Sequence, residues 1–600
     1  MLQTPPSYQD AAHNNGYEFS QGSGYQLPEY PFIEPPELAT GEVKRHDVVI
    51  VGGGLAGLTL ACALAQYGVK ALLLDEDNTV GVKGASSRGI CYAQKTLEIF
   101  KRLGLYDRIA AKGVQWSIGR TFAGHDEVYS FDLKTQQTHN VSQQPPFINI
   151  QQFYVEGFLV EQIYKTTAKQ PSANAKFEVR WSHRITAFEQ NADYATLQLQ
   201  TPAGCYSLEA THVVDCSGAR SPFRNWCGAN VTAKKGDDRW CIADVRFKNP
   251  PAVERHTWIE APFNENRAVW QHLMADGVWR IDYQMRPDAD PEEVSREDVV
   301  RERINGQLGR RVDPSEYEIV WVGPYAYRSE CLNELRRGRV FFVGDAAHVV
   351  SPFGARGGNS GVQDADNLAW KLAAVLQGRA APALLDNYHA ERHEAAEHNV
   401  RVTNRTARFL RPADGAERLF RTAAISLAKR HPFARQLVNT GRMSAPNIYS
   451  RSSACHSSGG RPAQNVAFAW ADASDGNKRI SKGRSTGSSG ELIDLLSWAG
   501  SSLLLLVFGD LTATDVLRLQ GLSGTDAVRC VQVVTSSGQI QAKEAVVDIN
   551  GHLLATCCGS ADAEPIRWAL LRPDTYLAAT GSQLDAGLVN AISSALGHAV

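Results

Sequence analysis

Glycines and two polar residues gather between positions 338 and 378 in a pattern that could bind an anion. The apolar run at 340–343 predicts a short strand, Gly344 a sharp turn, and the glycines that follow a loop that enters a helix near Asn359. A loop and helix start of this kind present unpaired backbone N–H groups and the positive end of a helix dipole. The strand, loop and helix would therefore position four candidate residues around a negative charge: Asp345, Gly357, Gly358 and Asn359.

A second glycine pattern, G-x-G-x-x-G at 52–57, follows the apolar strand DVVIV and precedes a helical run. Such glycines allow a tight turn, the approach of a pyrophosphate to the helix N-terminus, and close helix packing. An acid about 20 residues further on can bind a ribose hydroxyl pair. The pattern favours a dinucleotide site, although this unit alone does not distinguish FAD from NAD. Its candidate residues are Gly52, Gly54, Leu55, Ala56, Gly57, Asp75 and Glu76.

Composition limits the class of protein. With 600 residues, 43% of them hydrophobic and 21% charged, the chain is typical of a globular protein with several domains. A net charge of −2 gives no reason to expect nucleic acid or a membrane surface as a partner, and no apolar run reaches the ~18 residues of a membrane span. The 11 cysteines include no C-x-x-C pair, which favours reduced thiols, a cytoplasmic location and no metal site.

The stretch GDAAHVVSPFGARGGNSG resembles the GD motif of the FAD-dependent aromatic hydroxylases, of the para-hydroxybenzoate hydroxylase and phenol hydroxylase type. The resemblance implies that Asp345 binds the FAD ribityl chain. It also implies that the helix start at 357–359 faces the pyrimidine edge of the flavin, where it would stabilise reduced flavin. Pro352 lies where relatives use a backbone carbonyl near the reacting edge of substrate and flavin. The alternative is a glycine-rich crossover with a purely structural role.

Three shorter elements extend the resemblance. Ser87-Arg88 corresponds to a Pro-Arg element whose arginine contacts the FAD ribose or pyrophosphate, although an isolated arginine is more often a solvated surface residue. Gln152 begins a Q-x-x-V-E pattern that places glutamine near the flavin, or it simply caps a helix. Ser217-Gly218 stands where the family has Asp-Gly, which leaves open the part of this motif in handling NAD(P)H.

Aromatic-rich segments between 236 and 329 predict alternating strands, the main part of a sheet that covers the substrate. The resemblance places an arginine near flavin and substrate at Arg280, and His272 and Asp282 could approach the same cavity. For each of them the alternative is a structural ion pair or a capped strand end. If Arg280 faces the cavity, an anionic phenolic acid becomes the favoured substrate.

The resemblance implies an α/β fold in three parts. A Rossmann-like FAD-binding domain is expected at 45–235 and 330–450, with an inserted mixed β-sheet substrate domain at 236–329. Residues 461–600 resemble the thioredoxin-like C-terminal domain of phenol hydroxylase relatives, without its C-x-x-C. A packing or dimerisation role, and with it a homodimer, is expected for this domain.

Two segments lack a helical or strand period. Residues 1–44 predict an extended or disordered arm, whose apolar part, Tyr30–Pro36, either lies along the folded surface or remains a free tail. The serine- and glycine-rich stretch Ser450–Gly460 predicts a linker.

Only one complete G-x-G-x-x-G unit is present, so NADH or NADPH is expected to visit as a transient reductant. The resemblance, nearest to 3-(3-hydroxyphenyl)propionate-hydroxylase-like enzymes, implies a single-component monooxygenase. NAD(P)H would reduce FAD, O2 would add at flavin C4a, and the hydroperoxide would hydroxylate a phenolic or related small aromatic compound. His272, or a tyrosine acting through water, could accept the phenolic proton. An epoxidase, halogenase or oxidase on the same fold and a non-catalytic flavoprotein scaffold remain alternatives.

Overall fold

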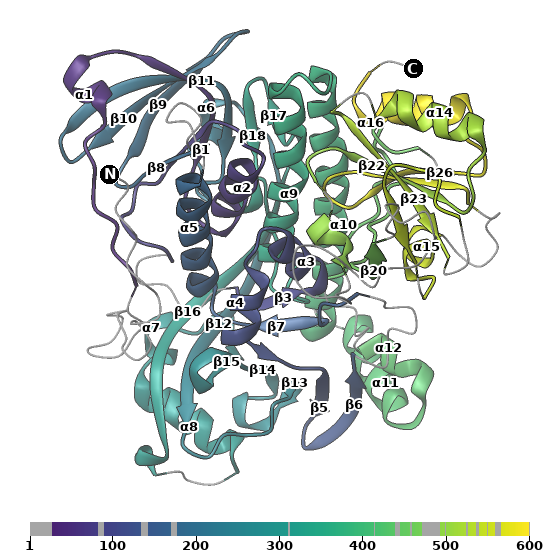
Figure 1. The fold of residues 1–600 in the computed structure, drawn as a ribbon. Coiled ribbons are helices and arrows are strands. Elements are labelled where there is room, and N and C mark those ends of the chain that lie inside the picture. The colour runs from purple at the N-terminus through teal and green to yellow at the C-terminus, as the bar shows by residue number, and fades with distance from the viewer. Residues whose placement is uncertain are drawn as a thin grey trace.

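The protein is described from a computed structural model. The residues described are 27–598 except 82–88, 134–141, 170–176, 310–312, 413–414, 439–443, 457–458, 471–492, 499, 524–525, 536–538, 549 and 559–565. The described residues form two 8-stranded sheets, one 7-stranded sheet and one 3-stranded sheet, joined by helices (Figure 1). The expected α/β class is confirmed.

The first sheet has a parallel centre. Its main path is β17-β18-β11-β1-β2-β8, and the hairpin β9–β10 extends it at β11. Residues 48–50 of β1 are fully buried, as expected of a parallel strand with both faces covered. The strands are β1 (Lys44–Val51), β2 (Ala71–Leu74), β8 (Glu178–Arg180), β9 (Arg184–Gln190), β10 (Ala195–Thr201), β11 (Gly204–Asp215), β17 (Arg336–Arg337) and β18 (Val340–Phe342). The helices against it include α2 (Leu55–Gln66), α5 (Gln152–Ala168) and α9 (Gly357–Leu376).

The second sheet has the order β19-β16-β12-β15-β14-β13-β5-β6. The segment 236–329 supplies most of it, and β5, β6 and β19 join from outside that segment. Its strands are β5 (Ile118–Ala123), β6 (Asp126–Asp132), β12 (Val231–Phe247), β13 (Arg255–Ala261), β14 (Arg267–Leu273), β15 (Val278–Gln284), β16 (Tyr317–Leu332) and β19 (His348–Val349).

Burial in this sheet differs from the predicted alternation. Every residue of β15 is buried. Ile281 and Tyr283 pack with Val300 and Ile304 of α8 (Glu297–Gln307) on one face. The alternate residues of β15 point to the other face, because successive strand residues point to opposite sides. That face is also covered, so the polar residues of β15 are interior residues.

The C-terminal region has its own mixed sheet, ordered β21-β20-β24-β23-β22-β25-β26. Its strands are β20 (Ala467–Trp470), β21 (Ile493–Asp494), β22 (Leu503–Phe508), β23 (Val528–Val534), β24 (Ala545–Val547), β25 (Trp568–Leu571) and β26 (Leu577–Gly581), and the region also contains α14 (Ala513–Leu522), α15 (His552–Cys557) and α16 (Ala586–Ala595). One face packs with Trp370 and Ala374 of α9, so this sheet shares a core with the first part of the chain.

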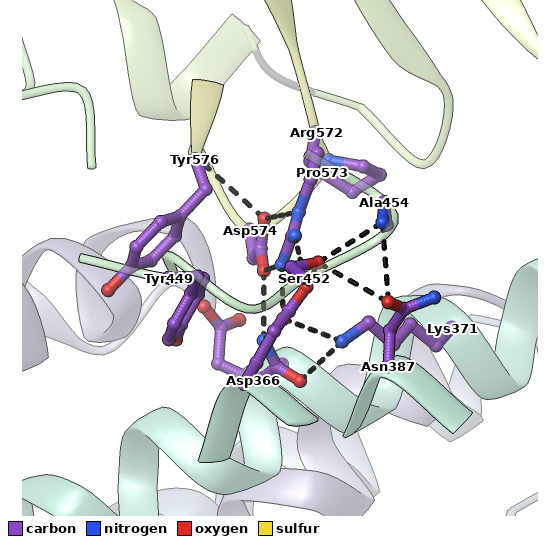
Figure 2. Close-up of polar contacts among 12 residues, drawn as sticks. Asp366, Lys371, Asn387, Tyr449, Ser452, Ala454, Arg572, Pro573, Asp574 and Tyr576 are labelled. Carbon is purple, nitrogen blue, oxygen red and sulfur yellow. Dashed lines mark hydrogen bonds and ion pairs between the residues drawn. The ribbon is translucent and has the colours of Figure 1, made fainter. Parts of the chain in front are cut away.

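A buried polar network joins this sheet to α9 and α10 (Asp386–Leu410), as Figure 2 shows. The predicted linker takes part in it. Ser452 donates a hydrogen bond to Glu391, and the backbone N–H of Ala454 donates to the Asn387 side chain. Both Ser452 and Ala454 are buried. The described residues of the predicted linker form no helix or strand, and its serines satisfy buried polar groups of α10.

The part of the N-terminal arm that the structure describes packs on the first sheet. Tyr30 is buried and stacks on Trp181 with ring centroids 4.4 Å apart. Glu37, in α1 (Pro36–Thr40), forms a buried ion pair with Arg180. Of the two readings of the apolar segment, packing along the surface is confirmed. None of the described helices is both long and apolar enough to cross a bilayer.

Candidate active site

Two glycines leave no room for a side chain where β1 leads into α2: Gly52 in the loop and Gly57 in the first turn of the helix. A Cβ on Gly57 would lie 2.0 Å from the carbonyl oxygen of Gly52. Gly52 has a positive φ of 105°, and a Cβ there would lie 2.5 Å from the carbonyl oxygen of Cys216. Helix α2 starts at Leu55 after an exposed Gly54, and among the described residues no side chain caps that start. Its first backbone N–H groups therefore remain available to an anion.

Asp75 braces this loop from the end of β2. Its carboxylate accepts hydrogen bonds from the backbone N–H groups of Gly53 and Asp77. Burial raises the pKa of Asp75, and the two backbone donors oppose that rise. Glu76 is exposed, and its Oε2 lies 3.7 Å from Nε of Arg184. The structure thus brings Asp75 to the loop and leaves Glu76 at the surface.

The GD turn packs against the start of α2. A Cβ on Gly344 would lie 3.0 Å from Cβ of Ala56. Asp345 is the one exposed residue in the run 340–348, all of which is described. Arg224 holds the turn by donating to the carbonyl oxygens of Asp345 at 2.8 Å and Ala346 at 2.9 Å. The exposed carboxylate therefore stands on a turn fixed by an arginine whose role the sequence did not reveal.

The start of α9 lies beside the start of α2. Gly358 is exposed, and a Cβ there would lie 3.3 Å from Cδ2 of Leu55. As at α2, no side chain of the described residues caps α9, which begins at Gly357. Two helix N-termini thus meet in one region, and both carry partial positive charge.

The side chain of Asn359 is engaged within the protein. It accepts a hydrogen bond from the backbone N–H of Ala93 at 2.9 Å and donates to the carbonyls of Cys91 at 2.8 Å and Ala355 at 2.6 Å. Ala93 and Cys91 belong to β3 (Cys91–Ala93). The amide therefore ties α9 to β3, and the helix offers backbone N–H groups at this end.

Asp364, on α9, is an organising residue that sequence reasoning missed. It is fully buried and accepts hydrogen bonds from the backbone N–H of Gly344 at 3.0 Å, from His348 at 2.7 Å and from Arg392. Burial alone would raise the pKa of Asp364, but His348 and Arg392 outweigh it and lower the pKa to about 2. One carboxylate thus fixes the GD turn to α9 and α10. A signal was present in the sequence, since an aspartate stands between apolar helix positions 362 and 365.

The Ser217-Gly218 motif depends on a second missed acid, Asp215, at the end of β11. The backbone N–H and the hydroxyl of Ser217 both donate to Asp215, at 3.0 and 2.6 Å, and the hydroxyl of Ser221 donates to its other oxygen. Gly218 has a φ of +85°. Burial raises the pKa of Asp215, and the two serines oppose the rise. Ser217 itself is exposed at the loop beside Gly52.

Gln152 is the first residue of α5 and binds its neighbours. It accepts from the backbone N–H of Gly89 at 3.1 Å and donates to Glu156 at 2.8 Å. Glu156 in turn accepts from the backbone N–H of Gly81 at 2.7 Å. Helix α5 therefore anchors the residues on either side of 82–88. The predicted Ser87 and Arg88 fall in that segment, outside the described residues.

Arg280, Asp282 and His272 come together on the second sheet. Arg280 Nε lies 3.0 Å from Asp282 Oδ1, and both side chains are buried. His272 pairs with Arg280 across β14 and β15, and its Nδ1 has no hydrogen-bond partner among the described residues. Burial, with Arg255 and Arg280 nearby, lowers the pKa of His272 well below its ordinary value, so this histidine is neutral.

This charged cluster lies close to the start of α9. His272 and Arg255 line a narrow crevice together with Trp116 and Asn149. Burial raises the pKa of the Cys91 thiol to about 11, against the opposing charges of Arg255 and Arg280. The backbone carbonyl of the same Cys91 accepts the hydrogen bond from Asn359. Strand β3 therefore connects the start of α9 to the charged face of the sheet.

The loop before α9 meets the aromatic part of the same sheet. Phe353 packs edge-on against Trp270, with centroids 4.9 Å apart, and Trp270 stacks on Trp240 at 4.6 Å. The carbonyl of the half-buried Pro352 accepts a hydrogen bond from the backbone N–H of Ala355, whose φ is +54°. A non-glycine residue in this left-handed region is strained, and such strain concentrates at functional loops.

The donor set fits a flavin dinucleotide. Two adjacent helix starts offer backbone N–H groups for a pyrophosphate and an anionic ring edge, and the glycine loop leaves no room for a side chain. The exposed Asp345 lies beside them with an acceptor for hydroxyl groups.

Comparison with known proteins agrees with this fit. A sequence profile of the FAD binding domain family matches residues 45–403. The 3-(3-hydroxy-phenyl)propionate/3-hydroxycinnamic acid hydroxylase of Mycolicibacterium gilvum (strain PYR-GCK) is 30% identical over 414 residues, 68% of each chain. The solved structure of the flavin-dependent monooxygenase PieE, in complex with FAD and substrate, has a TM-score of 0.71 at 22% identity and covers 92% of this chain and 99% of its own.

A shorter solved structure matches as well. p-Nitrophenol 4-monooxygenase PnpA of Pseudomonas putida DLL-E4 gives a TM-score of 0.58 at 26% identity and covers 67% of this chain and 100% of its own. The profile match, which extends over more than half of the chain, and the identity to the hydroxylase establish the family. The chain belongs to the FAD-dependent aromatic hydroxylases and is an FAD-dependent monooxygenase.

Proposed function

We propose that this monooxygenase uses NADH or NADPH and O2 to hydroxylate a phenolic or related aromatic compound. The observation that carries the proposal is the contact between the loop before α9 and the second sheet. Phe353, next to Pro352, packs on Trp270, and Trp270 pairs across the sheet with Asp282. Aromatic walls beside a buried charged cluster suit the ring and the oxygen of a phenol.

FAD, when bound, supplies the redox chemistry and the activation of O2. In this proposal the α2 start binds the pyrophosphate, Asp345 the ribityl chain, and the α9 start the pyrimidine edge. Asp75 and Ser217 hold the loops that carry these groups, which the hydrogen bonds of Asp75 to Gly53 and of Ser217 to Asp215 support. The route through flavin C4a stays a prediction, as does the visiting NAD(P)H.

The charged face of the sheet is proposed to bind the phenol. The buried Arg280 and the half-buried Arg255 bring two positive charges near Asp282 and the neutral His272. Positive charge lowers the pKa of a nearby hydroxyl, so this face favours the phenolate form, which is the more nucleophilic ring. It would equally favour a carboxylate on the substrate, hence the preference for phenolic acids. The buried surroundings exclude water from the reaction.

The domain division is retained as a proposal. The first sheet supports an FAD-binding domain at 45–235 and 330–450, and the second sheet supports a substrate domain based on 236–329. The mixed C-terminal sheet, with helices α14 to α16, supports a thioredoxin-like domain at 461–600. A homodimer and a cytoplasmic location stay predictions.

The test is a panel of phenolic acids and neutral phenols added to the FAD-loaded enzyme. Oxidation of NADH and of NADPH is followed with and without each compound. After reaction under isotopically labelled O2, the molecular masses of the products are measured by mass spectrometry. We expect at least one compound to stimulate oxidation and to gain one labelled oxygen atom on its ring. Stimulated oxidation with no labelled product, or an epoxide as product, would refute aromatic hydroxylation.

A further inference from the structure

A hairpin of two helices, α11 (Ala416–Arg430) and α12 (Pro432–Val438), leaves a row of large apolar side chains in solvent. On α11 the exposed positions 416, 419, 420, 423 and 427 follow the spacing of one helix face. On α12 the exposed residues Phe433 and Leu437 are four positions apart, so they lie on the same side of the helix. The exposed fractions are 72% for Leu419, 55% for Phe420, 40% for Leu427, 72% for Phe433 and 42% for Leu437. We call these five side chains the apolar row.

The apolar row is not needed to attach the hairpin. The opposite face of α11 is already anchored, because Ile425 belongs to a buried cluster that includes Trp240, Trp270 and Phe353. Arg421 pairs with Glu260 at 2.6 Å, and Lys429 pairs with Asp126 at 2.6 Å. Helix α11 therefore buries one apolar face in the core of the protein and leaves a second apolar face exposed. A contiguous exposed apolar row of this kind marks an interaction surface.

The row is surrounded by positive charge. Residues 401–435 contain nine arginines and lysines and two acids, and with Glu260 and Asp126, which pair with Arg421 and Lys429, the net charge of this region is +5 in a chain whose net charge is −2. Several of these cations are exposed on the C-terminal end of α10 and on α11: Arg401, Arg405, Arg408, Arg418 and Arg430. Such a local excess attracts an anionic partner even though the whole chain is nearly neutral.

Charge and shape select the occupant. A second copy docking through this hairpin would bring two clusters of +5 together, which Coulomb repulsion disfavours. Helices α11 and α12 lie at an outer corner of the molecule (Figure 1), and Phe433 and Leu419 on them are each 72% exposed. A protein partner would need a groove shaped to them, whereas a lipid bilayer conforms to protruding side chains. We infer that the α11–α12 hairpin docks the enzyme on an anionic lipid surface, with the apolar row inserted among the headgroups and the arginines around it.

The docked orientation has a consequence for the substrate site. The hairpin covers the aromatic cluster of Trp240, Trp270 and Phe353 on its inner side and would meet lipid on its outer side. A bilayer concentrates apolar aromatic compounds, so docking would place the proposed substrate site close to a reservoir of them. The docking itself does not depend on which compound is hydroxylated.

The experiment is flotation of the FAD-loaded full chain with vesicles of phosphatidylcholine, or of phosphatidylcholine mixed with phosphatidylglycerol. We expect binding to the mixed vesicles that is at least about tenfold stronger than to the neutral ones and that weakens with added salt. The double variant Phe420→Ser/Phe433→Ser should weaken binding to mixed vesicles at least about tenfold. Its matched control is Leu517→Ser/Val589→Ser, which removes two exposed apolar side chains of the C-terminal domain and should leave binding unchanged.

A second variant separates charge from apolar contact. Arg418→Glu/Arg430→Glu should abolish the preference for anionic vesicles, whereas Arg518→Glu, at an exposed arginine of α14, should preserve it. Bound flavin and far-ultraviolet circular dichroism verify folding of every variant. Equal binding to neutral and anionic vesicles, or binding unaffected by both hairpin variants, would overturn the inference. So would sedimentation showing that the apolar row mediates a dimer, or an acidic protein as its occupant in place of lipid.

Discussion

Arg572, just after β25, and Glu391 of α10 form an ion pair with 2.6 Å between Nη1 and Oε1 and no solvent exposure of either side chain. Glu391 also binds Lys371 of α9, with 2.7 Å between Oε2 and Nζ. Arg572 also binds Asp574, as Figure 2 shows. Burial would raise the pKa of Glu391, but the two cations hold it far below its ordinary value. The pair therefore links the C-terminal sheet to both long helices behind the GD turn.

Removing one partner of this pair should destabilise the folded protein. Arg572→Met leaves Glu391 buried with less positive charge, so we expect the free energy of unfolding to fall by about 3–5 kcal/mol. Urea-induced unfolding measures it. The matched control is Arg529→Met, which breaks a pair with Glu544 whose side chains are 35% and 37% exposed and should cost at most about 1 kcal/mol. Equal losses in the two variants would show that burial of the pair is unimportant.

Asp364 should make the protein sensitive to acid. Its pKa is about 2 in the folded chain against an ordinary 3.8, so its stabilising contribution is complete above pH 3.8 and is lost as the pH falls toward 2. The shift corresponds to about 2 kcal/mol. In Asp364→Asn this part of the pH dependence should disappear, while the protein is less stable at neutral pH. Unfolding free energies measured over the acid range test this, and parallel curves for variant and wild type would contradict it.

Gly57→Ala should abolish FAD binding, because the added Cβ would lie 2.0 Å from a backbone carbonyl oxygen and would push α2 away from the loop. Flavin absorbance of the purified and reconstituted protein gives the bound fraction. Gly521→Ala in α14 is the control, since a Cβ there meets nothing within 4 Å. It should retain FAD and gain up to about 1 kcal/mol of stability, the helix propensity of alanine over glycine. Full FAD content in Gly57→Ala would contradict the close approach.

Arg280→Ala should raise the Michaelis constant for a phenolic acid about tenfold or more, because a charged hydrogen bond is worth about 1.5–3 kcal/mol. The constant for a neutral phenol should change far less. Arg246→Ala on the adjacent strand β12, where the arginine pairs with the exposed Glu318, should alter neither constant. Equal increases for acid and neutral phenol would remove the assignment of Arg280 to a substrate carboxylate.

The sequence predicted the elements better than the partners of its polar side chains. Helix α9 was expected near Asn359 and begins at Gly357, because glycine spacing and apolar periodicity are local signals. The bonds of Asn359 to β3 and of Asp364 to His348 and Arg392 join residues 16 to 268 positions apart. No periodicity encodes such pairings.

The burial of two polar segments was not predicted from the sequence, for a shared physical reason. Serine and glycine at 450–460 have the composition of a linker, and the polar residues of β15 have the alternation of a half-exposed strand. In the folded chain Ser452 and Arg280 are buried, because Glu391 and Asp282 lie within reach to satisfy them. Polarity in a sequence indicates solvent only where the fold supplies no partner.

The buried Arg572–Glu391 pair also limits how this chain could lose its C-terminal sheet. PnpA matches over its whole length yet covers 67% of this chain. Deleting the C-terminal sheet here would expose Glu391 and strip Lys95 of its bonds to Asp574 and Thr575. The sheet is therefore not a detachable module. Loss of the sheet would leave charged residues of α3 (Gln94–Arg102), α9 and α10 without partners, so a stable shorter chain would need changes at those positions as well.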